Sequence, residues 1–471
     1  MRKLLYVALG AVAGCAGADA STLGLPELFD PPVLTDLNPD PNIVEVRLVA
    51  GVSTTEYLTG KQTDVWAYRD GALADSRATV PGPMLKAKKG DQVIVHFTNE
   101  LPDMETTVHW HGLRLPAEFD GAPSFQMPAI RAGGEFEYRF VARDASTFWY
   151  HPHMRANEQI ERGLYGPMFI EGDVAPDVAA DRYLILDDVK IDADGSLNRE
   201  TTELDRMMGR QGNVLLVNGR RAPVHLRVAA KSRERWRIVN GANGRYFNLQ
   251  IPGAELLVIA SDGGLLPEPY ATRTLLVTPG ERYDVLVTFD DRVGVNPVLQ
   301  TVHYDRGHQL PDVGPQDLMK ISFGPAAQTP EPLAVSWPTL PRLDVSETTP
   351  VRRFVLDEYA QPGFPVVFTI NGERWPDNQH VRVKQGVTEI WEVRNAAAMD
   401  HPFHLHGMFF QVLGGDGQVR ARDGWKDTVN IPQRATVRFA VRYDPLGMWM
   451  FHCHILEHAE FGMMGELMVE P

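Results

Sequence analysis

Hydrophobic and polar residues alternate with a period of two along much of the chain. The runs Gln92–Phe97 and Arg282–Val287 are two examples, and turn residues separate such runs from one another. Successive side chains of a strand point to opposite faces, so this alternation is typical of strands that bury one face. Many short strands of this kind, in a chain of 471 residues with 41 Gly and 35 Pro, predict an all-β protein built from antiparallel sandwiches.

The same order of segments recurs along the chain. Residues 90–112 and 386–407 each contain a strand-like run that leads to a His-x-His-Gly motif, and residues 235–250 repeat the run but end in Phe-Asn-Leu-Gln. Residues 148–171 and 449–470 each contain a second histidine pair followed by a Gly-containing strand. Repeats at this scale predict duplicated domains. The predicted domains span residues 40–173, 178–325 and 345–471, with a Pro- and Thr-rich linker near residues 325–349.

The N-terminus predicts export. A basic start followed by an apolar run indicates that residues 1–20 are a signal peptide. Val12–Cys15 resembles a bacterial lipobox, in which Cys15 would become the lipidated first residue, whereas Ala18–Ala20 is an A-x-A site that would remove it. We favour the lipobox because cysteine is otherwise rare in this chain. Both alternatives place the protein in the periplasm or cell envelope, with residues 21–39 forming a Pro- and Asp-rich arm.

Charge and hydropathy exclude several classes of partner. The net charge of -15 argues against a nucleic-acid partner, since phosphate binding needs a basic surface. No apolar run after the N-terminus is long enough to span a bilayer, so the predicted membrane contact is limited to a lipid on Cys15. The only other cysteine is Cys453, and two cysteines cannot form a disulfide framework.

The densest candidate chemistry lies near the C-terminus. Cys453, His458 and Met463 supply three of the four ligands of a blue-copper site, which takes two His, one Cys and a weak axial Met. In an extended segment alternate side chains share a face, so His452 and His454 point away from the cysteine sulfur and are free to bind a different metal. The alternatives are a structural zinc site or a few buried polar residues.

Histidine pairs extend this chemistry over the two outer repeats. The pairs are His109/His111, His151/His153, His404/His406 and His452/His454. Each pair on a strand presents two imidazoles to one side, and eight imidazoles exceed any four-coordinate zinc site but suffice for three metal ions. Since the first and third domains each provide two pairs, a shared cluster must lie at their interface, with the second domain as a spacer. The scattered histidines, interpreted as surface or packing residues, are His96, His225, His303, His308 and His380.

These motifs resemble those of the multicopper oxidases, in particular the three-domain bacterial laccases and cuprous oxidases. The resemblance covers nearly the whole mature chain. It is carried by H-W-H-G at 109–112, H-P-H at 151–153, H-P-F-H-L-H-G at 401–407 and H-C-H-I-L-E-H-x-x-x-x-M at 452–463. It implies three cupredoxin-like Greek-key β-sandwich domains, with type 1 copper in the third and no copper ligands in the second.

The resemblance also implies four copper ions per chain. Type 1 copper would be bound by His401, Cys453 and His458, with Met463 axial. Type 2 copper would be bound by His109 and His404. The type 3 pair would be bound by His111, His151 and His454 on one ion and by His153, His406 and His452 on the other. All of these residues are present, so an inactive relative without ligands is not expected.

The reaction that the resemblance implies is the oxidation of a small reducing substrate by O2, with four electrons reducing O2 to two waters. Electrons would pass from type 1 copper through Cys453 and its neighbours to the other three ions. Asp120 matches the family's acidic residue near type 2 copper and is a candidate proton relay, although Asp-Gly is also a common turn. The family often has a second carboxylate directly after the type 1 histidine. Here Ala459 stands at that position and Glu460 follows, which leaves the second proton donor open.

The substrate is predicted from what the chain lacks. Specialised cuprous oxidases often carry a long Met-rich insertion, because thioethers bind Cu(I), and this chain has none. We therefore expect a monomeric, laccase-like enzyme for phenols and aromatic amines. Cu(I) oxidation in copper tolerance is the alternative, followed by copper binding without turnover. The nearest candidates for Cu(I) contacts are Met207, Met208, Met399 and Met408.

Overall fold

The computed structural model describes residues 24–123, 126–172, 174–289, 296–308, 310–326, 333, 335–360 and 365–471. The predicted signal peptide, Cys15 and the first three residues of the predicted arm lie outside these residues. Strands dominate the described chain, which confirms the all-β prediction. The helices are single short turns, namely α1 (Ala156–Glu161), α2 (Glu203–Met208), α3 (Leu456–Glu460), η2 (Ala117–Phe119) and η3 (Ala421–Asp423).

The first unit contains two four-stranded sheets, ordered β2-β1-β4-β6 and β3-β8-β7-β5. Apolar side chains alternate into the space between the sheets, as the period-two pattern predicted. Its strands are β1 (Ile43–Leu58), β2 (Lys61–Asp70), β3 (Leu85–Lys88), β4 (Gln92–Asn99), β5 (His109–His111), β6 (Glu135–Val141), β7 (Thr147–His151) and β8 (Gly166–Glu171).

The second unit contains a seven-stranded sheet, β11-β10-β9-β13-β18-β15-β16, and a five-stranded sheet, β12-β20-β19-β14-β17. A separate hydrophobic core fills it, in which Trp236 is fully buried. Its strands are β9 (Ala180–Val189), β10 (Val214–Val217), β11 (Arg220–Arg221), β12 (Val224–Ala230), β13 (Ser232–Asn240), β14 (Phe247–Gln250), β15 (Leu256–Ser261), β16 (Gly264–Thr272), β17 (Leu275–Val277), β18 (Arg282–Phe289), β19 (Val298–Thr301) and β20 (Gln316–Ala326).

The third unit contains two five-stranded sheets, ordered β22-β21-β24-β28-β26 and β23-β30-β29-β25-β27. Its core continues into that of the first unit, so that Trp110 and Trp449 belong to one buried cluster. Its strands are β21 (Val351–Tyr359), β22 (Val367–Ile370), β23 (Val381–Lys384), β24 (Thr388–Asn395), β25 (His401–Leu405), β26 (Phe410–Val412), β27 (Thr428–Ile431), β28 (Thr436–Arg442), β29 (Gly447–Cys453) and β30 (Met464–Glu470).

One strand arrangement recurs in all three units. β4 pairs in parallel with β1 and antiparallel with β6. β13 has the same relation to β9 and β18, and β24 has it to β21 and β28. The central strands β4, β13 and β24 are the ones that the sequence repeats contain. The domain boundaries given above stay predictions, but each sheet draws its strands from one of the three stretches.

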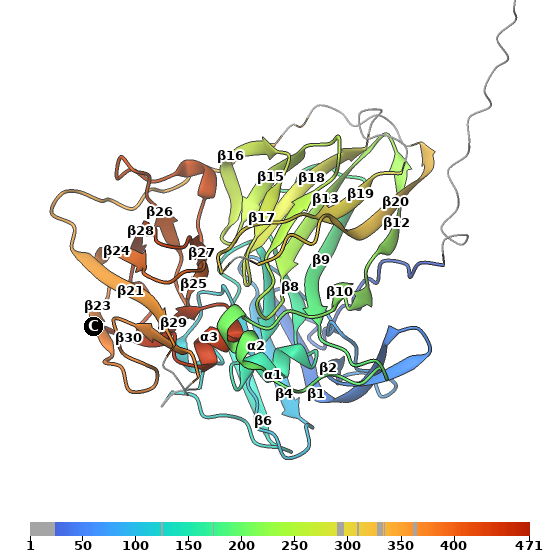
Figure 1. Ribbon diagram of the computed structural model, residues 1–471, viewed down its shortest axis with the longest axis horizontal. Helices are drawn as coiled ribbons and strands as arrows, with labels where there is room; N and C mark the ends of the chain where they lie inside the picture. The colour runs from blue at the N-terminus through green and yellow to red at the C-terminus, as the bar shows by residue number, and fades with distance from the viewer. Residues whose placement is uncertain are drawn as a thin grey trace, which may run out of the picture.

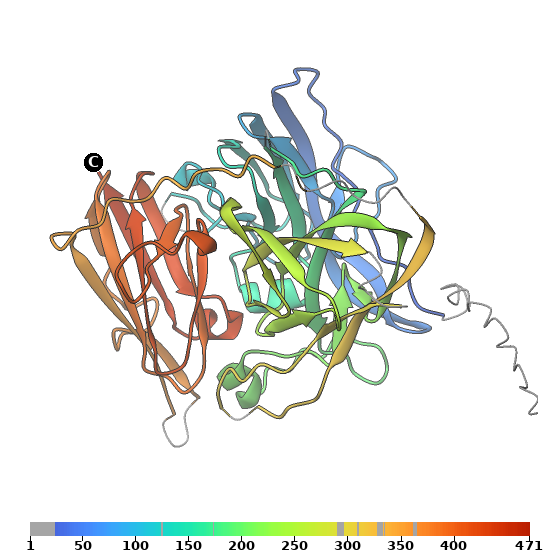
Figure 2. The ribbon, with the colours of Figure 1, turned by 90° about the horizontal axis from the view of Figure 1, so that it is seen from above.

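The three units meet around the short helices. Figure 1 shows α1, α2 and α3 at the centre, between the orange-red third unit, the green-yellow second unit and the blue-teal first unit. In the view of Figure 2 the third unit stands beside the other two. Helix α3 contacts both α1 and α2, so it lies where all three units converge.

The described part of the N-terminal arm forms backbone hydrogen bonds with both the second and the first unit. The backbone N–H of Leu28 donates to the His225 carbonyl at 2.8 Å, and the N–H of Leu34 donates to the Met84 carbonyl at 2.9 Å. His225 also lies against Glu27 and Ser322, which agrees with its interpretation as a packing residue.

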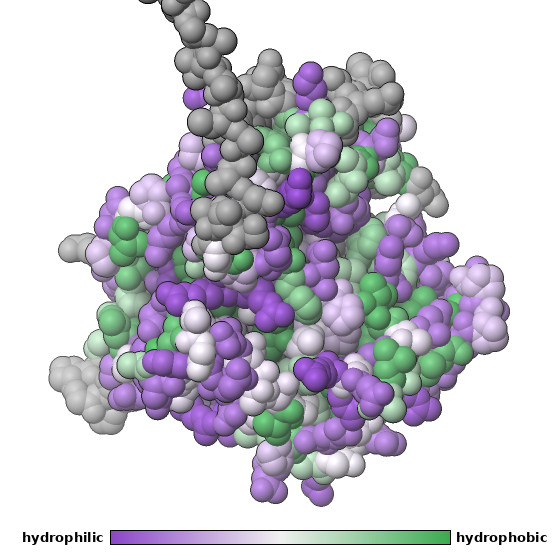
Figure 3. All heavy atoms as spheres, turned by 90° about the vertical axis from the view of Figure 1, so that its right-hand side faces the viewer, coloured by the Kyte–Doolittle hydropathy of each residue, from purple (hydrophilic) through white to green (hydrophobic). Residues whose placement is uncertain are grey.

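The outer surface is mixed in polarity. On the face in Figure 3, hydrophilic and hydrophobic side chains are interspersed. Among the described residues, no helix has the length and apolar character needed to cross a membrane.

Candidate metal centre

The strands bring the histidine pairs of each unit side by side. In the first unit β5 and β7 are antiparallel neighbours, with His109 opposite His151. In the third unit β25 and β29 are antiparallel neighbours, with His404 opposite His452. Alternate residues of a strand face the same side, so each sheet presents two pairs of imidazoles on one face.

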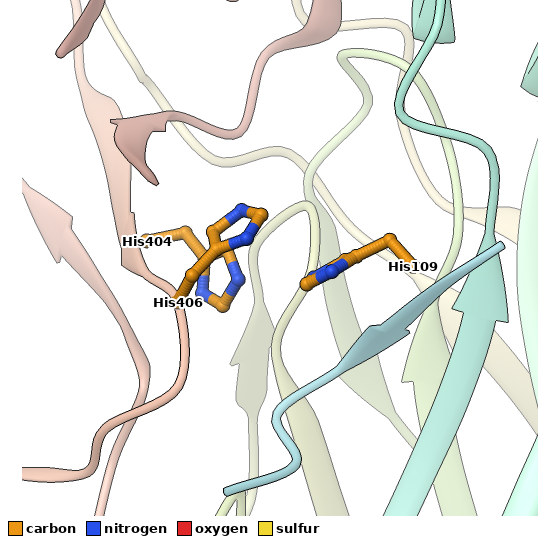
Figure 4. A group of neighbouring side chains, drawn as sticks. All are labelled: His109, His404 and His406. Carbon is orange, nitrogen blue, oxygen red and sulfur yellow. The ribbon is translucent and has the colours of Figure 1, made fainter. Parts of the chain in front are cut away.

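The imidazoles of the first and third units meet across the interface between these units. The ring of His109 stacks on that of His406 with centroids 4.0 Å apart, and Figure 4 shows these two rings together with His404. The rings of His111 and His404 stack at 3.9 Å. The structure therefore brings together all four histidine pairs that the sequence singled out.

Two sets of rings converge on common points. The Nε2 atoms of His406 and His153 lie 3.0 and 3.3 Å from Nε2 of His452. On the other side, Nδ1 of His111 lies 3.4 Å from Nε2 of His151, and the His454 ring is 5.0 Å from that of His111. These separations suit ligands of one ion better than hydrogen bonds between neutral rings, because two lone pairs face each other.

Hydrogen bonds fix the orientation of most of these rings. Carbonyl and carboxylate oxygens only accept, so a ring nitrogen beside such an oxygen carries the proton and the opposite nitrogen keeps its lone pair. The nitrogens that donate in this way are Nδ1 of His109 to Asp120 O at 2.8 Å, of His151 to Pro152 O at 2.9 Å, of His404 to Asp427 O at 3.0 Å, of His406 to Asp120 Oδ2 at 2.8 Å and of His452 to Cys453 O at 3.0 Å.

Several buried ring nitrogens of this cluster have no hydrogen-bond partner among the described residues. They are Nε2 of His109, Nε2 of His404 and both nitrogens of His454. A buried polar atom without a partner is costly, and metal ions at the convergence of these rings would satisfy Nε2 of His109, Nε2 of His404 and one nitrogen of His454. The donor set is entirely imidazole, which suits copper. The residues present therefore fit a cluster of copper ions.

Burial also keeps these rings in the neutral form, which can bind a metal. It lowers the pKa of His153 to about 3, with neighbouring histidines contributing. Burial, followed by charge repulsion from neighbouring rings, holds the pKa of His406, His452 and His454 well below the usual range. The rings are therefore neutral at ordinary pH, and a neutral imidazole is the form that binds a metal.

A second site lies in the third unit alone. Nδ1 of His401 is 3.4 Å and Nδ1 of His458 is 3.7 Å from Sγ of Cys453, and the two Nδ1 atoms are 3.2 Å apart. Met463 is buried beside them, and its backbone N–H donates to the His458 carbonyl at 2.8 Å. Burial raises the pKa of the Cys453 thiol, so binding a metal here must release a proton. Two imidazoles, a thiol and a nearby thioether make up the donor set of a blue-copper site.

Asp120 connects two rings of the cluster. Its Oδ2 accepts from His406 Nδ1 at 2.8 Å, and its carbonyl accepts from His109 Nδ1 at 2.8 Å. The residue is only 3% exposed and precedes Gly121, which adopts φ +81°. Asp120 is thus both the residue of an Asp-Gly turn and a contact of the cluster.

Glu460 contacts the backbone of the first unit. Its Oε1 accepts from the backbone N–H of Ala156, at the start of α1, at 2.7 Å. Among the described residues, no hydrogen bond or ion pair joins Glu460 to a clustered histidine. Its predicted role as second proton donor stays a prediction.

Sequence reasoning missed Asp427. Its Oδ1 lies 3.3 Å from His111 Nε2, and Arg282 pairs with both of its oxygens. Burial opposes the charge of Asp427, but the Arg282 guanidinium and several hydrogen bonds outweigh it and hold the pKa well below its usual range. Asp427 is distant in sequence from His111 and belongs to no motif, so no local pattern could have identified it.

A pocket of about 460 Å³ lies beside the Cys453 site. Met207, on α2, lines the pocket, and its carbonyl accepts from Nε2 of His458 at 3.2 Å. His308 also lines it, and the interpretation of this histidine as a surface or packing residue stays a prediction. The other lining residues are Asp357, Glu358, Tyr359, Ala360, Val366, Ala396, Ala397, Ala398 and Arg434. Met399 and Met408 are instead buried in the hydrophobic core.

Comparison with known proteins gives the same picture along the whole chain. Three sequence models described as multicopper oxidase match residues 56–174, 181–308 and 346–471. A multicopper oxidase of Staphylococcus epidermidis is 30% identical, with 95% of this chain and 94% of the relative covered. A laccase of Bacillus subtilis is 27% identical, with 85% and 89% covered.

Solved structures agree. A multicopper oxidase from Campylobacter jejuni, described as a metallo-oxidase, superposes with a TM-score of 0.82 at 27% identity, with 97% of this chain and 98% of that chain covered. McoA multicopper oxidase from Aquifex aeolicus gives a TM-score of 0.82 at 30% identity, with 95% and 100% covered.

Proposed function

The chain belongs to the multicopper oxidase family, and on this premise we propose that it binds four copper ions and oxidises phenols and aromatic amines with O2. Membership confirms the resemblance, the three-domain cupredoxin-like fold and an oxidoreductase activity that uses copper, O2 and a small reducing substrate. The number of ions, their ligands and the substrate class are the proposal.

The proposed ligands are those expected from the motifs. His401, Cys453 and His458, with Met463 nearby, would hold type 1 copper. His109 and His404, whose Nε2 atoms lack partners among the described residues, would hold type 2 copper. The type 3 ions would be held by His153, His406 and His452 and by His111, His151 and His454.

The observation that carries this proposal is the junction at Cys453. His452 and His454 are its neighbours in the chain and face the histidine cluster, while its sulfur faces His401 and His458. The peptide chain therefore links the two sites directly. When bound, copper supplies one-electron redox chemistry at the cysteine site and O2 reduction at the cluster.

Glu358 gives the pocket beside His458 a proton acceptor. Its Oε1 accepts from His308 Nε2 at 2.7 Å and from the Ala398 N–H at 3.0 Å. Its Oε2 is buried and has no partner among the described residues. Glu358 lines the pocket, so its carboxylate can accept the proton that a phenol bound there releases as it loses an electron. A carboxylate at the pocket favours a phenol as substrate.

Oxygen uptake tests the proposed activity. The copper-loaded protein should consume one O2 for every four one-electron oxidations of 2,6-dimethoxyphenol, and metal analysis should find four copper ions per chain. A fully loaded protein that consumes no O2 would instead be a copper-binding protein without turnover.

The Glu358→Gln variant tests the substrate pocket. The amide keeps an accepting oxygen for His308 but replaces the free acceptor by an N–H donor. We expect kcat/KM for the phenol to fall about 100-fold, the usual scale for losing a general base. The rate with ferrocyanide, which has no proton to lose, should not change. Equal losses with both donors would contradict the proton-acceptor role.

Cu(I) oxidation is the second candidate. The same pocket brings together a thioether from Met207, an imidazole from His308 and the carboxylates of Asp357 and Glu358, which together could bind Cu(I). Steady-state rates for Cu(I) and for 2,6-dimethoxyphenol on one copper-loaded preparation separate the candidates. Met207→Leu should lower the Cu(I) rate selectively if Cu(I) is the substrate.

The location of the protein is also proposed from the sequence. We propose export to the periplasm or cell envelope, with a lipid anchor on Cys15, and a monomeric chain. Intact-mass measurement on the membrane fraction should find a lipidated mature N-terminus at Cys15. A soluble product that starts near Ser21 would remove the anchor, and one that retains Met1 would contradict export. Light scattering of purified protein tests the monomer.

A further inference from the structure

A buried group of charged side chains lies directly behind the histidine cluster. Arg282 and Asp262 come from the second unit and are fully buried, and Asp427 and Lys426 come from the third unit and are 1% and 3% exposed. The second unit holds none of the proposed copper ligands, yet it delivers this guanidinium to the edge of the cluster.

Each guanidinium nitrogen of Arg282 donates a hydrogen bond, and the acceptors come from all three units. Its Nη1 and Nη2 donate to the two carboxylate oxygens of Asp427 at 2.7 and 2.6 Å, a bidentate pair. Its Nε donates to the Thr147 carbonyl at 3.2 Å, and Nη2 also donates to the Asp262 carbonyl at 3.1 Å. With both oxygens held in one plane by the guanidinium, the Asp427 carboxylate has a fixed direction.

The direction of the Asp427 carboxylate sets which nitrogen of His111 carries the proton. Thr428 Oγ1 acts with it, because it donates to Asp427 Oδ1 at 2.8 Å and lies 3.4 Å from His111 Nε2. Asp427 Oδ1 lies 3.3 Å from His111 Nε2. An ionised carboxylate only accepts, so the His111 proton belongs on Nε2 and the lone pair is left on Nδ1. This Nδ1 is the atom that faces His151 Nε2 at 3.4 Å.

His111 is therefore oriented in the opposite sense from its neighbours. The rings of His109, His151, His404, His406 and His452 each place Nδ1 against an accepting oxygen and leave Nε2 for the cluster. Their acceptors are backbone carbonyls or Asp120. For His111, by contrast, the nearest acceptor is the Asp427 carboxylate, which a residue of the second unit holds.

The surrounding backbone is shaped around the same pair. A Cβ on Gly112, which follows His111, would lie 2.4 Å from Arg282 Nη2 and 2.7 Å from Asp427 Oδ2. A Cβ on Gly280, two residues before Arg282, would lie 2.8 Å from the His454 ring. Both glycines have positive φ, +93° and +84°. The second unit thus packs directly against the cluster at this turn.

We infer that Arg282 is a positioning residue of the second unit which, through Asp427, makes His111 present Nδ1 rather than Nε2 to the metal cluster. The inference rests on the proposed copper cluster. It adds a ligand-orienting role to the spacer role that the sequence predicted for the second unit. Residues of this kind, which orient a ligand from behind, usually change metal affinity or activity about 10- to 100-fold when they are lost.

The first test determines which ring nitrogen of His111 carries the proton in the copper-free wild-type chain. Long-range ¹H–¹⁵N correlation on ¹⁵N-histidine protein, with the His111 signal identified by its loss in His111→Gln, should show the proton on Nε2. The signals of His109 and His404 should show it on Nδ1. A His111 proton on Nδ1 would overturn the inference, whether or not any variant folds.

The second test uses Arg282→Lys and Arg282→Gln, with Arg182→Lys as the matched control. Arg182 makes a similar bidentate pair with Glu234 in the same unit, at 2.7 and 2.9 Å, away from the cluster. We expect both Arg282 variants to keep the blue absorption of the cysteine site but to hold fewer than the wild-type number of copper ions. Turnover should fall about 10- to 100-fold. Arg182→Lys should keep wild-type copper content and turnover.

A double-mutant cycle separates action through Asp427 from a general structural effect. If Arg282 acts through Asp427, turnover of the Arg282→Gln/Asp427→Asn protein should match that of the more impaired single variant. Multiplied losses, or wild-type copper content in Arg282→Gln, would overturn the inference. Wild-type protein without blue absorption or without bound copper would instead contradict the proposed function.

Discussion

Replacement of Asp120 by Asn tests whether this residue only orients the cluster or also carries protons to it. The carboxylate is 3% exposed, and its Oδ2 accepts from His406 Nδ1 at 2.8 Å. An amide oxygen can accept the same bond but carries no charge and cannot exchange a proton. Its N–H₂ group would also take the place of Oδ1, which lies 3.5 Å from His109 Nδ1, so two donors would face each other.

The two roles predict different magnitudes. A hydrogen bond to a charged acceptor is worth about 1 kcal/mol more than one to a neutral acceptor. Loss of orientation alone therefore slows the reaction roughly fivefold. Loss of a proton relay slows it by about 100- to 10,000-fold. We expect the larger effect.

Stopped-flow absorption separates the two halves of the reaction. Bleaching of the blue band by an anaerobic phenol should stay at the wild-type rate, since the cysteine site lies in the third unit and does not contact Asp120. Recovery of the band on mixing with O2 should slow by about 100-fold or more. The pH optimum of turnover should fall, because the remaining route depends on protons from bulk water.

Asp70→Asn is the matched control. Asp70 is also buried in the first unit, at 4% exposed, and accepts from backbone N–H groups of Thr35 and Ala72 without contacting a clustered histidine. Its variant should recover at the wild-type rate. Recovery of Asp120→Asn at the wild-type rate across acid and neutral pH would show that Asp120 is a turn residue. A loss of only about fivefold would leave it an orienting role.

Three further predictions concern the rest of the molecule. Cys453→Ser should abolish the blue absorption and the oxidase activity while the fold is kept. Because burial raises the pKa of the Cys453 thiol, copper uptake by the wild type must release the thiol proton. The apparent copper affinity of this site should therefore rise up to tenfold per pH unit, as equilibrium titration at several pH values would show. Gly121→Ala should lower the free energy of unfolding by about 3 kcal/mol or more in urea titrations, because at φ +81° its Cβ would lie 1.9 Å from the Val108 carbonyl oxygen. The control Gly133→Ala, at φ +72° with open space around it, should lower the free energy of unfolding by about 1 kcal/mol. Glu460→Gln should slow recovery after O2 mixing less than Asp120→Asn does, because the amide oxygen can still accept from Ala156; an equal loss in the two variants would give Glu460 an equal share in proton supply.

The fold class and the candidate ligands could be predicted from the sequence because both are expressed locally. Alternation with a period of two follows from the geometry of a single strand, as in Gln92–Phe97, which lies within β4. A His-x-His pair faces one side of its strand whatever lies around it, so His109 and His111 could be recognised without a partner strand. The Cys453 neighbourhood was equally informative, because chain connectivity alone places His452 and His454 beside it.

Packing among the three units decided the rest. Asp427 reaches His111 from 316 positions further along the chain, and Arg282 reaches Asp427 from a unit without histidine pairs. Glu358 and Met207 border one pocket from different units. Such contacts depend on how sandwiches dock, and docking is set by the shape and charge of whole surfaces rather than by any local spacing. The sequence therefore determined which side chains could bind copper, and the tertiary structure decided which nitrogen each presents and which distant charge holds it there.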